Sequence, residues 1–155
     1  MAEIKNITTP LTDEVIADLH VGDMCNITGV IYTGRDAAHK IMTEKLDANE
    51  ALPVDFTDQV IYYAGPTPAK PGHVIGSCGP TTSGRMDAYT PRLLDLGLTA
   101  MIGKGERSQA VIDAIVRNQS AYFCAVGGAG ALIACCIKEA TEIAFHDLGC
   151  ESVKR

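Results

Sequence analysis

The sequence lacks several features that would assign it to a particular class of protein. No apolar run approaches the roughly 18 residues that a membrane-spanning helix needs, so we expect no membrane partner. The N-terminus has no basic patch, apolar core and small-residue cleavage site, so we expect no secretory signal and a cytoplasmic location. A net charge of −6 leaves no basic excess for a phosphate backbone, and we expect no nucleic-acid partner.

Closely spaced cysteine pairs are also absent. The chain has six cysteines and no C-x-x-C spacing of a zinc or redox site: Cys25, Cys78, Cys124, Cys135, Cys136 and Cys150. We expect most of them to be small buried hydrophobic residues in a reduced compartment. Distant cysteines can in principle converge on an iron–sulfur cluster, but Cys135 and Cys136 would point in different directions on a helix and Cys150 lies near the chain end. We therefore expect no metal ligands in this chain.

The sequence does contain alternating strand and helix signals, over a length that fits one domain. Its 155 residues, 46% of them hydrophobic, fit a single domain over residues 1–155 that buries roughly two-thirds of its unfolded surface. Hydrophobic periodicity and turn signals predict strands at 24–31, 60–64, 73–77, 99–102, 121–126 and 141–145, and helices at 13–19, 35–48, 84–95, 110–116 and 129–137. This alternation predicts an α/β fold with a mixed sheet and flanking helices. It does not determine the order of the strands in the sheet.

Local signals refine these boundaries. Thr12 and Ser108 are suitable N-caps for the helices that follow them. Pro91 should bend or restart its helix, and Gly97 suits the end of it. The proline-rich stretch 65–72 cannot be regular structure, because proline lacks the N–H donor and has a fixed φ.

Three loops share one layout that points to an anion site. The stretches 33–36, 81–85 and 103–108 each place a cation at or just before a helix N-terminus: Arg35, Arg85 and Lys104. Helix N-termini offer free N–H donors and partial positive charge, and such loops tend to share one edge of an α/β sheet. Two arginines and a lysine suit a small dicarboxylate, which Thr82 and glycine N–H groups would orient.

Other interpretations of these loops stay open. Thr33, Thr82 and Ser108 can be ordinary caps and the three cations solvated charges at helix ends. A nucleotide phosphate is a weaker alternative, because the glycines of 103–105 and 127–130 lack the P-loop and Rossmann spacings. His39 lies one helical turn beyond Arg35, either on the pocket rim or as an ordinary surface or core histidine.

The same loops carry a family resemblance. The stretch from Gly79 to Asp87, GPTTSGRMD, resembles the signature of the β subunit, or C-terminal domain, of class I fumarate hydratases and L(+)-tartrate dehydratases. Two further stretches of this chain resemble the companion motifs of that family: GRDAAH, which begins at Gly34, and Lys104-Gly105 with Ser108. The likeness also includes Gly65-Pro66, Pro71-Gly72 and the closing stretch 126–149, and so covers nearly the whole chain.

The resemblance implies a fold, a cofactor and a partner. The fold would be a swivelling β/β/α domain, and a larger α subunit would hold a [4Fe–4S] cluster through three cysteines, in an assembly of two α and two β subunits. Arg35, Arg85 and Lys104 would grip a four-carbon dicarboxylate, and Thr81 would exchange a proton with the substrate carbon. The open iron would act as Lewis acid in the reversible hydration of fumarate to malate. The chain is short for this family, and Cys78 just before the signature is more plausible as a packing residue than as a cluster ligand.

Three further functions remain to be weighed. Tartrate dehydration to oxaloacetate is the close second, since both substrates are four-carbon dicarboxylates. A non-catalytic module that binds an organic anion or a partner protein belongs to a different class. A standalone lyase without a cluster is disfavoured, because the chain shows no metal-ligand spacing and no strong acid/base pair.

Overall fold

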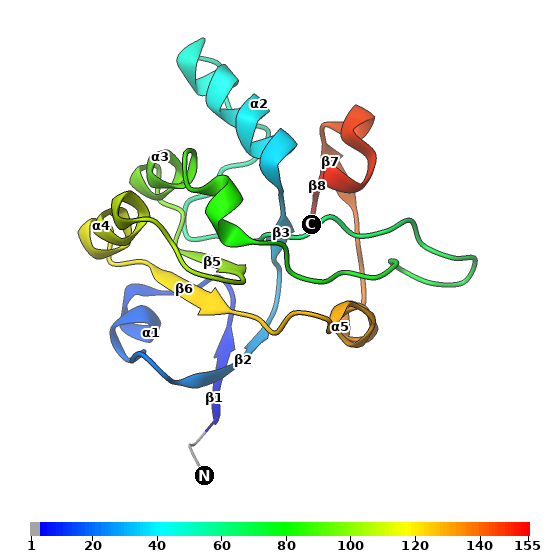
Figure 1. The fold of residues 1–155 in the computed structure, drawn as a ribbon, viewed down its shortest axis with the longest axis horizontal. Helices are drawn as coiled ribbons and strands as arrows, with labels where there is room; N and C mark the ends of the chain where they lie inside the picture. The colour runs from blue at the N-terminus through cyan, green and yellow to red at the C-terminus, as the bar shows by residue number, and fades with distance from the viewer. Residues whose placement is uncertain (1–3) are drawn as a thin grey trace.

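A six-stranded mixed sheet organises the protein, which is described for residues 4–155 by a computed structural model (Figure 1). Its strand order is β6-β5-β4-β3-β8-β7, and the strands are β3 (Tyr32–Thr33), β4 (Val60–Tyr62), β5 (Ala100–Gly103), β6 (Ala121–Cys124), β7 (Glu142–Ala144) and β8 (Val153–Lys154). β3 to β6 run parallel, while β8 pairs antiparallel with both β3 and β7. A separate parallel pair consists of β1 (Ile4–Thr8) and β2 (Met24–Thr28).

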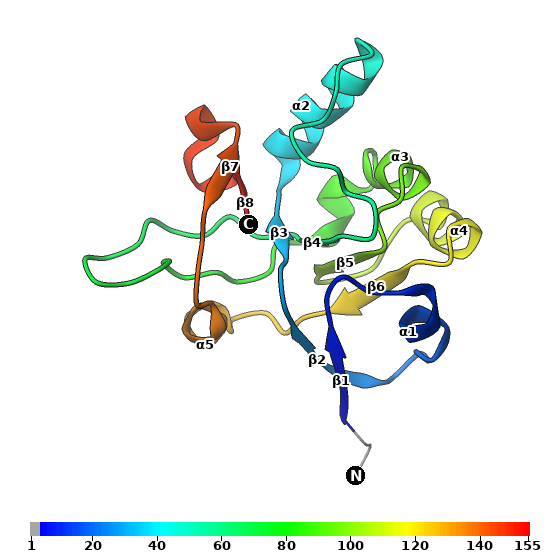
Figure 2. The same ribbon diagram turned by 180° about the vertical axis from the view of Figure 1, so that it is seen from behind.

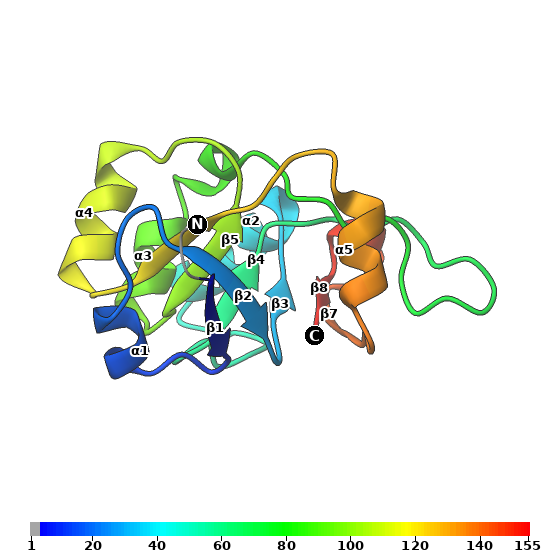
Figure 3. The ribbon, with the colours of Figure 1, turned by 90° about the horizontal axis from the view of Figure 1, so that it is seen from below.

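Helices and the small sheet cover opposite faces of the large sheet. The helices are α1 (Asp13–Ala17), α2 (Asp36–Asp47), α3 (Thr90–Asp95), α4 (Gln109–Arg117) and α5 (Gly130–Cys136), with 3-10 helices η1 (Ser83–Met86) and η2 (His146–Glu151). Figures 1 and 2 show α2, α3 and α4 on one side of strands β3 to β6 and the β1–β2 pair with α1 on the other. Viewed from below, β1 and β2 cross in front of the central strands (Figure 3).

Burial on both faces explains the apolar run in β4 and β5. Successive strand residues point to opposite faces, so Ile61 and Met101 join the core beneath the helices, and Val60 and Ala100 join the core beneath β1 and β2. All four of these side chains are at most 1% exposed. The polar loops can therefore gather only at the strand ends.

The predicted α/β class with a mixed sheet and flanking helices is confirmed. Helices 35–48 and 110–116 correspond to α2 and α4, and strand 99–102 corresponds to β5 within one residue at each end. Pro91 restarts the predicted helix 84–95, which is divided into η1 and α3. Thr12 caps α1 as predicted, accepting a hydrogen bond from the Val15 N–H at 3.4 Å.

Two predicted strands were wrong in part or in whole. The continuous buried strand 24–31 is instead the half-exposed β2, because Gly29 adopts a φ of +118° and turns the chain before β3. An added Cβ on Gly29 would lie 2.4 Å from Thr9 Oγ1, so only glycine fits this turn. The predicted strand 73–77 is irregular and belongs to the long loop that extends away from the sheet in Figure 2.

Strand β8 was not predicted, and one predicted cap was wrong. β8 is two residues long, too short for a periodic signal. Ser108 occupies the N-cap position of α4, but its side chain makes no capping hydrogen bond. Among residues 4–155, no helix combines the length and apolar character needed to cross a bilayer.

Gly103, at the end of β5, gives a direct test of the packing. A Cβ there would lie 2.0 Å from Ser83 Oγ and 2.8 Å from Tyr63 Cδ2, so Gly103→Ala must displace a buried tyrosine. We expect the free energy of unfolding to fall by about 1–3 kcal/mol in urea denaturation. Gly84→Ala is the control, since its nearest atom would be Glu106 O at 3.9 Å. Equal stability of the two variants would contradict the packing described here.

Candidate active site

The three cation-bearing loops leave the sheet at one edge. Arg35 comes two residues after β3, and Lys104 follows β5 directly. The signature segment lies beyond β4, where Pro80 bridges to Ala64 and the Thr81 N–H donates to the Tyr63 carbonyl at 2.8 Å. β3, β4 and β5 are adjacent parallel strands, so their carboxyl ends place the three loops side by side.

Arg35 and Arg85 meet at one carboxylate. Arg85 Nη2 forms an ion pair with Asp36 Oδ2, and Arg35 Nε lies 3.9 Å from Asp36 Oδ1. Arg35 Nε also lies 3.2 Å from Glu151 Oε1. Both Arg35 Nε and Asp36 Oδ1 are buried without a hydrogen-bond partner. The arrangement therefore concentrates two guanidinium groups and leaves part of their hydrogen-bonding capacity unused.

Lys104 lies beside the signature segment. Thr82 pairs with Lys104 in a parallel bridge, and the Ser83 N–H donates to the Lys104 carbonyl at 2.9 Å. On its other side is Gly127, where an added Cβ would lie 3.8 Å from Lys104 Nζ. Within residues 4–155, no carboxylate forms an ion pair with this ammonium group. Its positive charge is thus available to an anion.

The threonines occupy the middle of this edge. Thr81 is partly buried and Thr82 exposed, and their backbone groups are held by β4 and Lys104. No hydrogen bond joins either hydroxyl to another of the residues 4–155. A hollow of about 640 Å³ lies elsewhere, between β1 and α1, and none of the predicted site residues lines it. The candidate site is accordingly an open edge in this chain.

Two acidic residues of this edge were missed by sequence reasoning. Asp36 stands within the GRDAAH motif directly after Arg35, and that position was the only signal in the sequence. Glu151 had no signal, because it reaches Arg35 through tertiary pairing: β8 lies against β3, with the Lys154 N–H donating to Thr33 Oγ1 at 3.3 Å.

Cys78 behaves as a packing residue. Its side chain is fully buried, and burial raises the pKa of the thiol to about 11, so the thiolate that binds metals is disfavoured. The Cys78 N–H donates to the Gly130 carbonyl at 3.0 Å, which ties the signature segment to the start of α5. The expectation that most of the six cysteines are buried is wrong, because only Cys78 is fully buried and Cys25 partly buried, whereas Cys124, Cys135, Cys136 and Cys150 are exposed. All six are free, and residues 4–155 contain no group of three His, Cys, Asp or Glu side chains placed to hold a metal ion. The described residues therefore do not fit an iron–sulfur cluster as its ligands.

His39 is a core residue beneath Arg35. Its Nδ1 lies 2.8 Å from the Arg35 carbonyl, which can only accept, so Nδ1 carries the proton. Its ring packs edge-on against Tyr63, with centroids 5.5 Å apart, and Nε2 has no hydrogen-bond partner. Burial lowers the pKa of His39 to about 4; nearby Arg107 also lowers it, while the Arg35 carbonyl and Asp36 oppose the shift. The imidazole is neutral at physiological pH and fixes the first turn of α2.

This buried histidine predicts a pH dependence of stability. Between its unfolded pKa of 6.5 and its folded value of about 4, the unfolded chain binds one proton more, so stability falls as the pH is lowered. From pH 7.5 to pH 5.5 we expect this group to lower the free energy of unfolding, measured by urea denaturation, by about 1 kcal/mol. His39→Gln should remove that contribution, whereas His73→Gln in the exposed loop should retain it. Identical pH dependence in wild type and His39→Gln would contradict the assignment.

Comparison with known proteins gives the family. The Fumarase C-terminus family model matches residues 2–155. The anaerobic class I fumarate hydratase of Escherichia coli is 40% identical over 145 residues, which cover 90% of this chain and 26% of that protein. Fumarate hydratase 2 of Leishmania major is 38% identical over 135 residues, which cover 86% of this chain and 24% of that protein. The putative L(+)-tartrate dehydratase subunit beta of Methanocaldococcus jannaschii is 36% identical over 140 residues, which cover 88% of this chain and 72% of that protein.

These shares differ in an informative way. The chain spans about a quarter of the length of the fumarate hydratases it matches, but most of the length of the tartrate dehydratase subunit. The match runs from residue 2 to residue 155, so it includes the three loops that carry Arg35, Arg85 and Lys104, which together form the cationic edge. The chain belongs to the Fumarase C-terminus family, whose curated relatives here are hydro-lyases.

Proposed function

We propose that this chain is the β subunit of a class I fumarate hydratase, which hydrates fumarate reversibly to malate together with a larger α subunit. The observation that carries the proposal is the edge where Arg35 and Arg85 converge on Asp36 while Lys104 is paired with Thr82. Two guanidinium groups and one ammonium group on a single edge suit a ligand with two carboxylates.

The partner is proposed from the similarity to a putative L(+)-tartrate dehydratase subunit beta, of which the chain covers 72%. The fumarate hydratases have about three-quarters of their length outside the region that this chain matches. A separate α subunit would supply that part, in an assembly of two α and two β subunits. As the family resemblance implies, it would also hold the [4Fe–4S] cluster, for which the described cysteines of this chain form no ligand set. A cytoplasmic location stays a prediction from the sequence.

In this proposal the chain binds and orients the substrate and handles one proton. Arg35 and Arg85 would bind one carboxylate in place of part of their contact with Asp36, and Lys104 would bind the other. In the dehydration direction, a deprotonated Thr81 Oγ1 would accept the C–H proton of malate and the C–H electron pair would form the double bond. The hydroxyl group would leave as water after taking a proton from an acid residue of the partner. Threonine is a weak base, so groups of the partner would have to activate it.

Tartrate dehydration is the second candidate. It is favoured by the similarity to the putative L(+)-tartrate dehydratase subunit beta, of which the chain covers 72%. Co-expression with the α subunit, anaerobic reconstitution and assays of fumarate, malate and the tartrate isomers would distinguish the two substrates. Malate binding without turnover in every reconstituted mixture would instead favour the non-catalytic module.

Arg85→Ala tests the carboxylate grip. The side chain is half exposed, so its removal should leave the fold intact while kcat/KM of the reconstituted enzyme falls about 10- to 100-fold, as expected for losing a charge-assisted hydrogen bond. Arg92→Ala is a matched control, since Arg92 is also an exposed arginine paired with an aspartate, Asp47. Near-normal kinetics of Arg85→Ala would count against the grip.

Thr81→Val tests the proton transfer. The substitution keeps roughly the same volume and removes the hydroxyl, so we expect kcat to fall about 100- to 10,000-fold with little change in substrate dissociation constant. Thr82→Val is the comparison, and it should raise KM more than it lowers kcat. If Thr81→Val still turns over at the wild-type rate, the base is another residue.

A further inference from the structure

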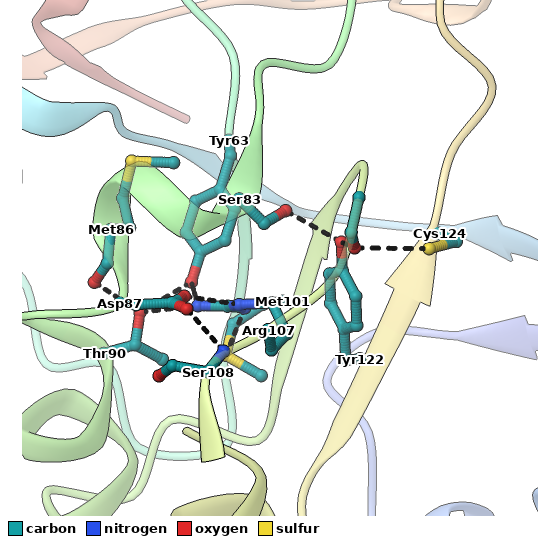
Figure 4. Close-up of polar contacts among 11 residues, drawn as sticks. Tyr63, Ser83, Met86, Asp87, Thr90, Met101, Arg107, Ser108, Tyr122 and Cys124 are labelled. Carbon is teal, nitrogen blue, oxygen red and sulfur yellow. Dashed lines mark hydrogen bonds and ion pairs between the residues drawn. The ribbon is translucent and has the colours of Figure 1, made fainter. Parts of the chain in front are cut away.

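A buried ion pair lies directly behind the candidate site. Arg107 Nε donates to Asp87 Oδ1 at 2.7 Å, and the Arg107 side chain is only 2% exposed (Figure 4). The other oxygen, Asp87 Oδ2, accepts from the Ser108 N–H at 2.6 Å. The Asp87 carboxylate thus accepts a hydrogen bond at the N-terminus of α4, where the Ser108 side chain makes no capping hydrogen bond.

The rest of the guanidinium group also makes contacts. Arg107 Nη2 donates to Thr90 Oγ1 at 2.9 Å and to the Tyr63 hydroxyl at 3.3 Å. The guanidinium carbon lies 5.2 Å from the ring centre of Tyr63 and 5.0 Å from that of Tyr122, within the range of cation–π contacts (Figure 4). These contacts fix both the position and the plane of the group.

The pair joins the two segments that carry the proposed ligands. Asp87 comes two residues after Arg85 in the signature segment, and Arg107 comes three residues after Lys104. A second connection parallels it: Ser83 Oγ lies 2.8 Å from the Tyr122 hydroxyl, which donates to the Gly105 carbonyl at 2.8 Å. Both connections hold residues 81–87 against residues 103–108.

A buried ion pair is weak support for stability, because desolvation offsets much of the Coulomb attraction. Its benefit here is geometric, since a planar fork with a carboxylate and two hydroxyl partners permits one arrangement. We infer that Asp87 and Arg107 are positioning residues, which fix Lys104 relative to Thr81, Thr82 and Arg85 so that the cations fit one substrate. This inference rests on the proposed function and goes beyond it in assigning residues that need not touch the substrate.

Asp87→Asn tests the inference with two measurements. In the isolated chain, amide hydrogen exchange should accelerate about tenfold or more in residues 81–87 and 103–108 relative to β4 and β5. In the reconstituted enzyme, kcat/KM should fall at least about tenfold. The separate variant Arg107→Lys should show a similar fall, because lysine keeps the charge but lacks the planar guanidinium group. Asp95→Asn is the matched control: it breaks the exposed Arg117–Asp95 pair between α3 and α4 and should change neither quantity.

Two further variants separate positioning from general destabilisation. Leu98→Ala opens a cavity in the core and should accelerate exchange broadly, with activity following only the folded fraction. Tyr122→Phe removes the hydroxyl contacts with Gly105 and Ser83 but keeps the ring, so it should loosen the same two segments even if Asp87→Asn fails to fold. Unchanged local exchange in the variants that fold, or activity losses like those of Leu98→Ala, would overturn the inference. An inactive wild-type complex would instead overturn the proposed function, and the exchange data would still judge whether the segments are clamped.

Discussion

The structure depends on the burial of both faces of β4 and β5. Helices cover one face and the β1–β2 pair covers the other, so the side chains of these strands are buried on both sides, apart from the partly buried Ile102. Polar and charged groups of the segments that follow are consequently confined to the strand ends. Parallel pairing of β3, β4 and β5 then brings those segments to one edge, which makes the location of the cations a result of core packing.

The cationic edge carries an energetic cost within this chain. Asp36 attracts two guanidinium groups, yet its Oδ1 and Arg35 Nε are buried without hydrogen bonds, and such groups cost about 1–3 kcal/mol each. Ion pairs of Arg35 with Glu151 and of Asp36 with Arg85 offset part of this cost. A dicarboxylate in the proposed site would accept a hydrogen bond from Arg35 Nε but could not donate one to Asp36 Oδ1.

How much the sequence could predict depended on the length of each signal. Helix α2 was predictable because apolar residues recur at helical spacing over twelve residues, and β5 because a short apolar run is bounded by glycines. The strand at 73–77 was wrong because Val74 and Ile75 have no neighbouring strand to pair with, a condition that lies outside the local sequence. For the site, the loop layout indicated Arg35, Arg85 and Lys104, whereas Glu151 and the clamp of Asp87 with Arg107 arise from tertiary contacts.

The contact between Gly130 and the signature segment has a mechanical consequence. A Cβ at Gly130 would lie 2.4 Å from Ser77 Oγ and 3.0 Å from the Gly79 nitrogen, and the Cys78 N–H donates to the Gly130 carbonyl, so α5 and the chain before the signature segment are in close contact. A side chain larger than hydrogen at position 130 would therefore push the first turn of α5 away from the segment that leads to Thr81, three residues beyond Cys78.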